Sequence, residues 1–116
     1  MPKPISAADA TPVRVVIVTM DAHLTSTVER AARRLAGDLP GLVLTVHAAA
    51  EWSNDPGALE RCRADIARGD IVVAAMLFLE DHFQPIMDVL RTRRDQCVGF
   101  VGALSASEVV RLTRIG

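Results

Sequence analysis

The stretch ADIARGDIVVAAMLFLEDH, residues 64–82, decides the fold of this chain. Gly69 can close a helix, and Asp70 precedes the run Ile71–Leu79, which contains no charged residue. A run of this length is too short for a membrane span, which needs about 20 apolar residues. Uncharged strands are typical of parallel sheets covered on both faces, so Ile71–Leu79 is predicted to be a buried strand.

Strand-like and helix-like segments alternate on both sides of this run. Four strands are predicted, at Val13–Met20, Leu42–Ala48, Ile71–Leu79 and Val98–Ala103. Consecutive strand–helix–strand units require a parallel sheet with right-handed crossovers. The predicted fold is therefore a three-layer α/β domain, Rossmann-like or flavodoxin-like, with about four mostly parallel strands and helices on both faces.

Capping residues mark the expected helix starts. They are Ser26 with Glu29, Asp55 before Pro56, Asp81 with Pro85 in the first turn, and Ser105 with Glu108. The helix after Asp81 is predicted to bury one stripe, formed by Phe83, Ile86, Met87 and Leu90. The last helix is predicted over Glu108–Arg114, with no strand after it.

Length and composition describe one domain. Of the 116 residues half are hydrophobic, which is enough for a packed core. Residues 1–12 are expected to form a flexible lead-in, and residues 13–116 a single α/β domain. Because the sequence stops directly after a predicted helix, with no closing strand, the chain is expected to be the first piece of something longer.

The composition also argues against several function classes. A net charge of −1 gives no pull towards nucleic acid, and three Phe and one Trp without Tyr make no base-stacking platform. Lys3 is the only lysine, so a phosphate-binding loop lysine is missing from the predicted domain. Cys62 and Cys97 form no Cys-x-x-Cys pair and suit a reduced, cytoplasmic protein without a transmembrane segment.

Three histidines follow predicted strands: His23, His47 and His82. The carboxyl ends of parallel strands share one edge, so the three rings are expected within about 10–15 Å of one another. Acidic and aromatic side chains are expected at the same edge, namely Asp21, Glu51, Trp52, Glu80 and Asp81. The sequence therefore predicts a polar edge facing a ligand or a partner.

This edge has two interpretations. In the functional one it receives a metal, a tetrapyrrole edge or a partner; in the structural one Asp21 and Asp81 cap helices and His23 and His82 bond to loop carbonyls. Capping and packing account for the pattern slightly better. The histidines and carboxylates of this edge lack the compact spacing of a closed zinc site, so no metal site is predicted. No nucleophile–base pair is found in the sequence, so no catalytic residue is predicted.

Two arginine clusters lie on predicted helices: Arg30, Arg33 and Arg34 on the first, and Arg91, Arg93 and Arg94 on the third. Basic residues at a helix C-terminus complement its dipole, which is the simpler explanation. The alternative is docking to an acidic partner surface.

Four segments carry a family resemblance: VVIVTMDAHL (15–24), VHAAAEW (46–52), CRADIARGDIVVAAMLFLEDH (62–82) and SASEVVRLTRIG (105–116). They resemble the N-terminal domain of the magnesium chelatase large subunit, the porphyrin-binding H subunit. The related large subunit of cobaltochelatase is the alternative assignment. An independent flavodoxin-like protein that binds a small molecule is a further alternative.

The resemblance implies that this chain is the N-terminal fragment of a much longer subunit. It also implies that the fragment belongs to an enzyme complex and is not catalytic by itself. The family's complex inserts Mg²⁺ into protoporphyrin IX in (bacterio)chlorophyll biosynthesis, and its AAA+ partner subunits of the I and D types hydrolyse ATP. The implied partners are those subunits, the rest of the large subunit and the porphyrin. No cofactor is expected on this segment, no catalytic residue carries over, and a non-catalytic docking module is the alternative role.

Overall fold

The computed structural model describes residues 12–21, 25–35, 37–39, 41–103 and 105–115. The elements follow in the order β1 (Val13–Thr19), α1 (Thr25–Leu35), β2 (Leu42–Ala48), η2 (Ala49–Glu51), α2 (Pro56–Arg68), β3 (Ile71–Ala75), α3 (Glu80–Arg94), β4 (Gly99–Ala103), α4 (Ser107–Val110) and β5 (Arg114–Ile115). The predicted lead-in lies almost wholly outside the described residues. None of the helices described is both long and apolar enough to cross a bilayer.

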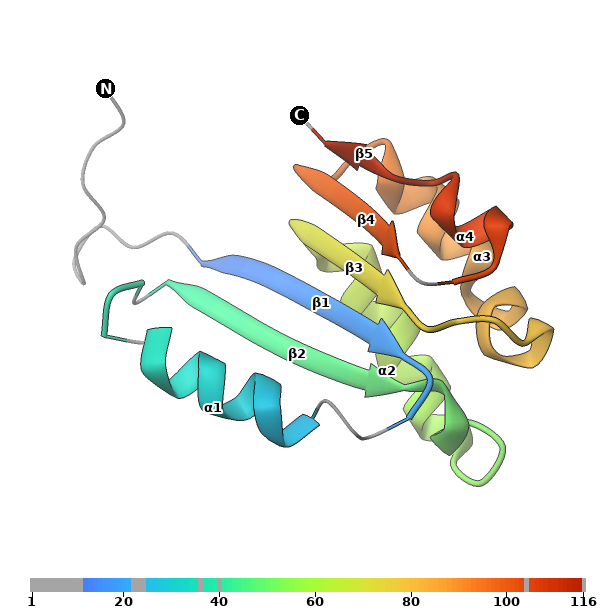
Figure 1. Cartoon of the computed structure of the whole chain (residues 1–116), viewed down its shortest axis with the longest axis horizontal. Helices are drawn as coiled ribbons and strands as arrows, with labels where there is room; N and C mark the ends of the chain where they lie inside the picture. Colours follow the sequence, from blue (N-terminus) through green and yellow to red (C-terminus); the bar gives the residue numbers. More distant parts are fainter. Residues whose placement is uncertain (1–11, 22–24, 36, 40, 104, 116) are drawn as a thin grey trace.

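The sheet has the order β2-β1-β3-β4-β5, and its first four strands run parallel (Figure 1). This confirms the predicted α/β class. The short strand β5 pairs antiparallel with β4 and was not predicted. The expected helix over Glu108–Arg114 ends at Val110. The Thr113 hydroxyl accepts a bond from Gly102 N–H and donates one to the Gly102 carbonyl, which draws the chain back along the sheet.

The third strand is shorter than predicted. It ends at Ala75, and the next residue, Met76, has a φ of 62°. This left-handed conformation turns the chain, so that Leu77 is fully buried while Phe78 and Leu79 are more than half exposed. An unbroken apolar run predicts a single strand, and the turn at Met76 is seen only in the backbone conformation.

Three of the predicted caps are wrong. Ser26 lies inside α1, Asp81 is the second residue of α3, and Ser105 precedes Ala106, the residue that caps α4. Pro85 lies in the second turn of α3 rather than the first. Asp55 does precede α2, with Pro56 as its first residue, although its side chain makes no capping bond.

One face of the sheet carries the core. Val16, Val18, Val72, Ala74 and Phe100 share that face, and each is at most 2% exposed. α2 and α3 cover them, and α3 contributes the stripe that was predicted from its spacing, Phe83, Ile86, Met87 and Leu90. Burying each large side chain contributes about 1.5–3 kcal/mol, so this layer is the main source of stability.

The other face is covered at one side only. Helix α1 packs beside β2, where Leu44 and Val46 point towards it, whereas α2 and α3 lie behind the sheet (Figure 1). The predicted three layers are present, but the second helical layer consists of α1. No residue of α1 is fully buried.

Candidate functional site

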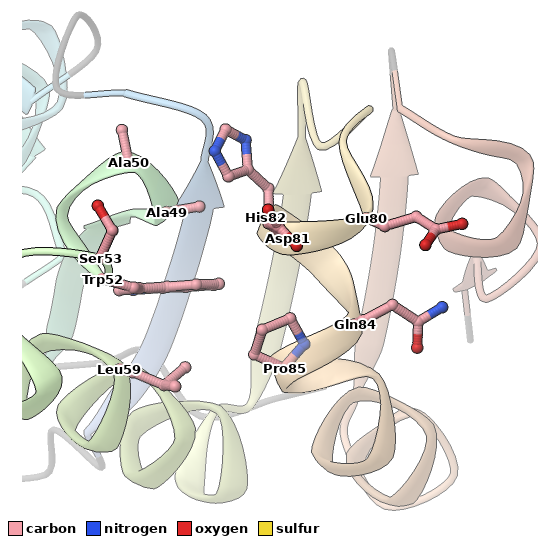
Figure 2. Close-up of a pocket in the computed structure, with 10 residues that line it drawn as sticks. All are labelled: Ala49, Ala50, Trp52, Ser53, Leu59, Glu80, Asp81, His82, Gln84 and Pro85. Atoms are coloured by element: carbon pink, nitrogen blue, oxygen red, sulfur yellow. The ribbon is translucent and has the colours of Figure 1, made fainter.

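A pocket of about 580 Å³ lies at the carboxyl end of the parallel strands (Figure 2). It lies between the segment after β2 and the first turns of α3. Its lining is formed by Ala49, Ala50, Trp52, Ser53, Leu59, Glu80, Asp81, His82, Gln84 and Pro85. In the order β2-β1-β3-β4 the chain reverses direction across the sheet between β1 and β3, and open α/β sheets bind ligands at such points. The volume suits a small molecule.

The β2 side of the pocket is held by backbone bonds. Ala50 N–H donates to the Met20 carbonyl at 2.8 Å, which ties η2 to the end of β1. Trp52 N–H donates to the Ala49 carbonyl at 3.1 Å and closes the short helix. These bonds fix the Trp52 indole against the core, where it is 8% exposed.

The α3 side is held through Leu77. Its N–H donates to Ser105 Oγ at 2.9 Å, and its carbonyl accepts from Ala106 N–H at 3.0 Å. The Ser105 hydroxyl donates in turn to the Ala103 carbonyl at 3.0 Å. Ser105 therefore anchors the loop that leads into α3 instead of capping α4.

The first turn of α3 brings three predicted site residues together: Glu80, Asp81 and His82. The two carboxylates complement the positive end of the helix dipole. Pro85 has no N–H, so the Asp81 carbonyl loses its helical partner next to the pocket. Figure 2 shows His82 and Pro85 on the side of α3 that faces Trp52, whereas Glu80 and Gln84 extend to the other side.

Two buried nitrogens in the described part of the chain have no hydrogen-bond partner, Trp52 Nε1 and His82 Nδ1. Buried polar atoms are almost always paired, so each exception asks for a physical reason. Both residues line the same pocket, and they come from different elements. This coincidence is the strongest local indication of a functional site.

The remaining predicted site residues lie elsewhere. His47 Nε2 is 2.7 Å from Asp65 Oδ2, so His47 faces α2 and ties β2 to that helix. Glu51 is exposed at the end of η2, and Asp21 follows β1; neither belongs to the lining. His23 lies outside the described residues. Of the three histidines, His82 is the one that the structure places in the pocket.

Six lining residues were not predicted from the sequence: Ala49, Ala50, Ser53, Leu59, Gln84 and Pro85. Gln84 and Pro85 lie one helical turn after Glu80 and Asp81, so helical spacing could have added them. Ser53 adjoins Trp52. Leu59, Ala49 and Ala50 have apolar side chains that carry no chemical signal of their own.

Ionic contacts outside the pocket serve the packing of helices. Arg63 of α2 donates two bonds of 2.8 Å to the Asp88 carboxylate of α3, and a third of 2.6 Å to the Pro85 carbonyl. This guanidinium lowers the pKa of Asp88 to about 2. Burial, with a smaller effect from Asp65, raises the pKa of the Cys62 thiol to about 12.

Two arginines of the second predicted cluster also have structural partners. Arg93 Nε donates to the Gly69 carbonyl at 2.7 Å and Arg94 Nε to the Leu112 carbonyl at 2.9 Å.

Within the described ranges no three His, Cys, Asp or Glu side chains are grouped so that they could hold a metal ion.

The fold and the pocket define a doubly wound α/β domain with a candidate site at its switch point. The chain belongs to the family described as "Domain of unknown function (DUF3479)", whose profile matches residues 14–116. It is 43% identical over 102 residues to the H subunit of the magnesium chelatase of Cereibacter sphaeroides, and 41% identical over 102 residues to that of Rhodobacter capsulatus.

Each alignment covers 88% of this chain but only 8% and 9% of the two relatives. The chain therefore spans less than a tenth of the length of these curated relatives. It is homologous to their N-terminal region of about 100 residues.

Proposed function

We propose that this chain is the N-terminal domain of the porphyrin-binding H subunit of a magnesium chelatase. The complex would insert Mg²⁺ into protoporphyrin IX in (bacterio)chlorophyll biosynthesis, in the cytoplasm, with ATP hydrolysed by AAA+ subunits of the I and D types. The identity of 43% over 102 of the 116 residues carries this proposal. Similarity at that level over nearly the whole domain supports a shared role within the large polypeptide.

In this proposal the domain assists the reaction without performing it. Lys3 is the only lysine of the chain, which fits a division of labour in which other subunits handle ATP. Trp52, Asp81 and His82 are proposed to face a ligand or a partner. The two unpartnered nitrogens of Trp52 and His82 support that role, because an incoming acceptor or donor would satisfy them.

The function is tested in the full-length protein reconstituted with its I and D partners. Formation of Mg-porphyrin, followed by fluorescence, is expected with the intact protein. Cobalt insertion without magnesium insertion would instead identify a cobaltochelatase. Failure to insert either metal would contradict the assignment to a chelatase.

The pocket is tested by two variants of that full-length protein, Trp52→Phe, which removes the indole N–H and keeps a ring, and His82→Ala. If the pocket handles the porphyrin, the variants raise its KM or lower kcat by about tenfold, the scale of one or two hydrogen bonds. Glu51→Ala, an exposed position outside the lining, is the matched control. Unchanged kinetics in both variants, with Mg insertion intact, would remove the pocket from substrate handling.

A role in docking is favoured by a separate observation. Phe78 and Leu79 are 56% and 59% exposed beside the first turn of α3, on a loop that Leu77 and Ser105 hold in place. Contiguous exposed apolar surface marks sites of protein contact. A pull-down of the I or D partner by the full-length protein, lost in Phe78→Ser, would support this docking role.

A further inference from the structure

One face of the sheet is apolar but only partly covered. On β1, β3 and β4 it carries Val15, Ile17, Ile71, Val73, Ala75, Val101 and Ala103, which alternate with the core residues of the opposite face. All seven are half-buried, whereas their neighbours Val16, Val72 and Phe100 are at most 2% exposed. None of the seven is charged or polar. Thr19, at the end of β1 on the same face, is polar and is 1% exposed.

No described helix covers this face over β3 and β4. α1 lies beside β2, where its side chains meet Leu44 and Val46, while α2, α3 and α4 belong to the opposite face (Figure 1). Antiparallel sheets that meet water on one face place polar residues there, and parallel sheets are normally covered on both faces. The composition of this face is that of a buried surface.

The length of the relatives indicates what covers it. The matched segment makes up 8% and 9% of the two magnesium-chelatase relatives, so more than nine tenths of each lies outside it. In this chain β5 ends at Ile115 beside β4, at the margin of the same sheet. A polypeptide continuing from that point in a longer protein would start next to the open face.

We propose that this face, here called the open face, is an interface within the full-length protein, packed against an apolar segment of the same polypeptide. The absence of charge on the seven residues selects an apolar occupant, such as one side of an amphipathic helix. The inference rests on the proposed function, because it takes the chain to be one domain of a longer chelatase polypeptide. The domain would then be fixed to the body of that polypeptide by this face, which leaves the pocket edge exposed.

The test is cysteine labelling with a maleimide in two proteins, the 116-residue chain and the full-length protein. Both carry Cys97→Ala, and the buried Cys62 remains. Val73→Cys and Val101→Cys probe the open face, and Val43→Cys is the control, a 43% exposed strand residue on the opposite face. Valine and cysteine are close in size, and circular dichroism checks that each variant folds.

The probes on the open face should react in the short chain and at least about tenfold more slowly in the full-length protein, while the control reacts alike in both. Equal rates at Val73→Cys and Val101→Cys in the two proteins would overturn the proposal. Protection in the short chain that grows with protein concentration would also overturn it, because a second copy would then be the occupant. Neither labelling measurement depends on magnesium insertion. A negative result for the interface is therefore distinguishable from a negative result for the chelatase assignment.

Discussion

Ser105 shows how much one hydroxyl can organise. It accepts a bond from Leu77 N–H and donates one to the Ala103 carbonyl, so it joins the loop before α3 to the end of β4. The loop carries the left-handed Met76, whose strained backbone needs fixed surroundings. The position of Glu80, Asp81 and His82 therefore depends on a residue that lies outside the pocket.

Replacing Ser105 by Ala should destabilise the domain by about 1–2 kcal/mol, because the Leu77 N–H loses its acceptor in a part-buried site. Urea unfolding followed by circular dichroism measures the loss. Ser107→Ala is the control, since that exposed hydroxyl donates a hydrogen bond to the exposed Glu108 carboxylate and to no buried group among the described residues. Equal unfolding midpoints for the two variants would contradict the anchoring role.

The ion pair between Arg63 and Asp88 makes stability depend on pH. The Arg63 guanidinium is the main cause that lowers the pKa of Asp88 from the ordinary aspartate value of 3.8 to about 2. A depressed carboxyl pKa gives stability that is present above the unfolded value and is lost as pH falls through the folded one. The contribution should therefore fade between pH values of about 4 and about 2.

Asp88→Asn should lower the urea midpoint near neutral pH and leave a smaller difference from the unchanged chain at the lowest pH. Measuring both proteins across this range gives two curves that converge on acidification. Curves that stay parallel would show that the pair does not couple to folding.

At the scale of elements, close backbone contact fixes α4 on the sheet. A Cβ atom added to Gly102 of β4 would lie 2.3 Å from the Val109 carbonyl oxygen of α4. Real side chains do not approach backbone so closely, so α4 would have to move. Gly102 thus permits the short helix to lie directly against β4 and lets β5 return along the sheet.

Gly102→Ala should cost about 1–3 kcal/mol through this overpacking and lower the Tm. Gly99→Ala lies in the same strand, where an added Cβ meets nothing within 4 Å, so its Tm should change little. Thermal unfolding of both variants checks the difference. A Gly102→Ala protein as stable as Gly99→Ala would mean that α4 does not depend on this contact.

At the scale of the whole molecule, the core between the sheet and the two helices α2 and α3 is continuous and includes Cys62, which is 0% exposed. Burial raises the pKa of its thiol to about 12, so the reactive thiolate is scarce as well as inaccessible. The reactivity of Cys62 should then report the opening of the whole domain.

In a Cys97→Ala chain, Ellman's reagent should leave Cys62 unmodified under native conditions. Its rate should rise with urea in parallel with the loss of circular dichroism, because opening of the core is required. Rapid labelling of Cys62 without denaturant would indicate a local opening of α2. Cys97 in the unchanged chain is half-buried and provides the faster reference.

The class of fold could be predicted from the sequence, because it depends on patterns among residues that are close together in the chain. β-branched runs and helical spacing are properties of neighbouring residues, and they placed four parallel strands and the stripe of α3 correctly. The end of β3 and the short α4 were misjudged. The bonds from Ser105 to Leu77 and from Thr113 to Gly102 join residues far apart in the chain, and no local pattern contains them.

The candidate site was likewise predicted in part from the sequence and decided in part by the tertiary structure. The sequence by itself determined that Trp52, Glu80, Asp81 and His82 lie at one edge of the sheet, because they follow strands that run parallel and therefore end at the same edge. Only the tertiary structure decided that His47 turns to Asp65, that Ala49 and Leu59 join the pocket, and that one sheet face stays open. Side-chain direction and the cover over a face depend on the packing of elements distant in sequence, and a linear pattern does not specify that packing.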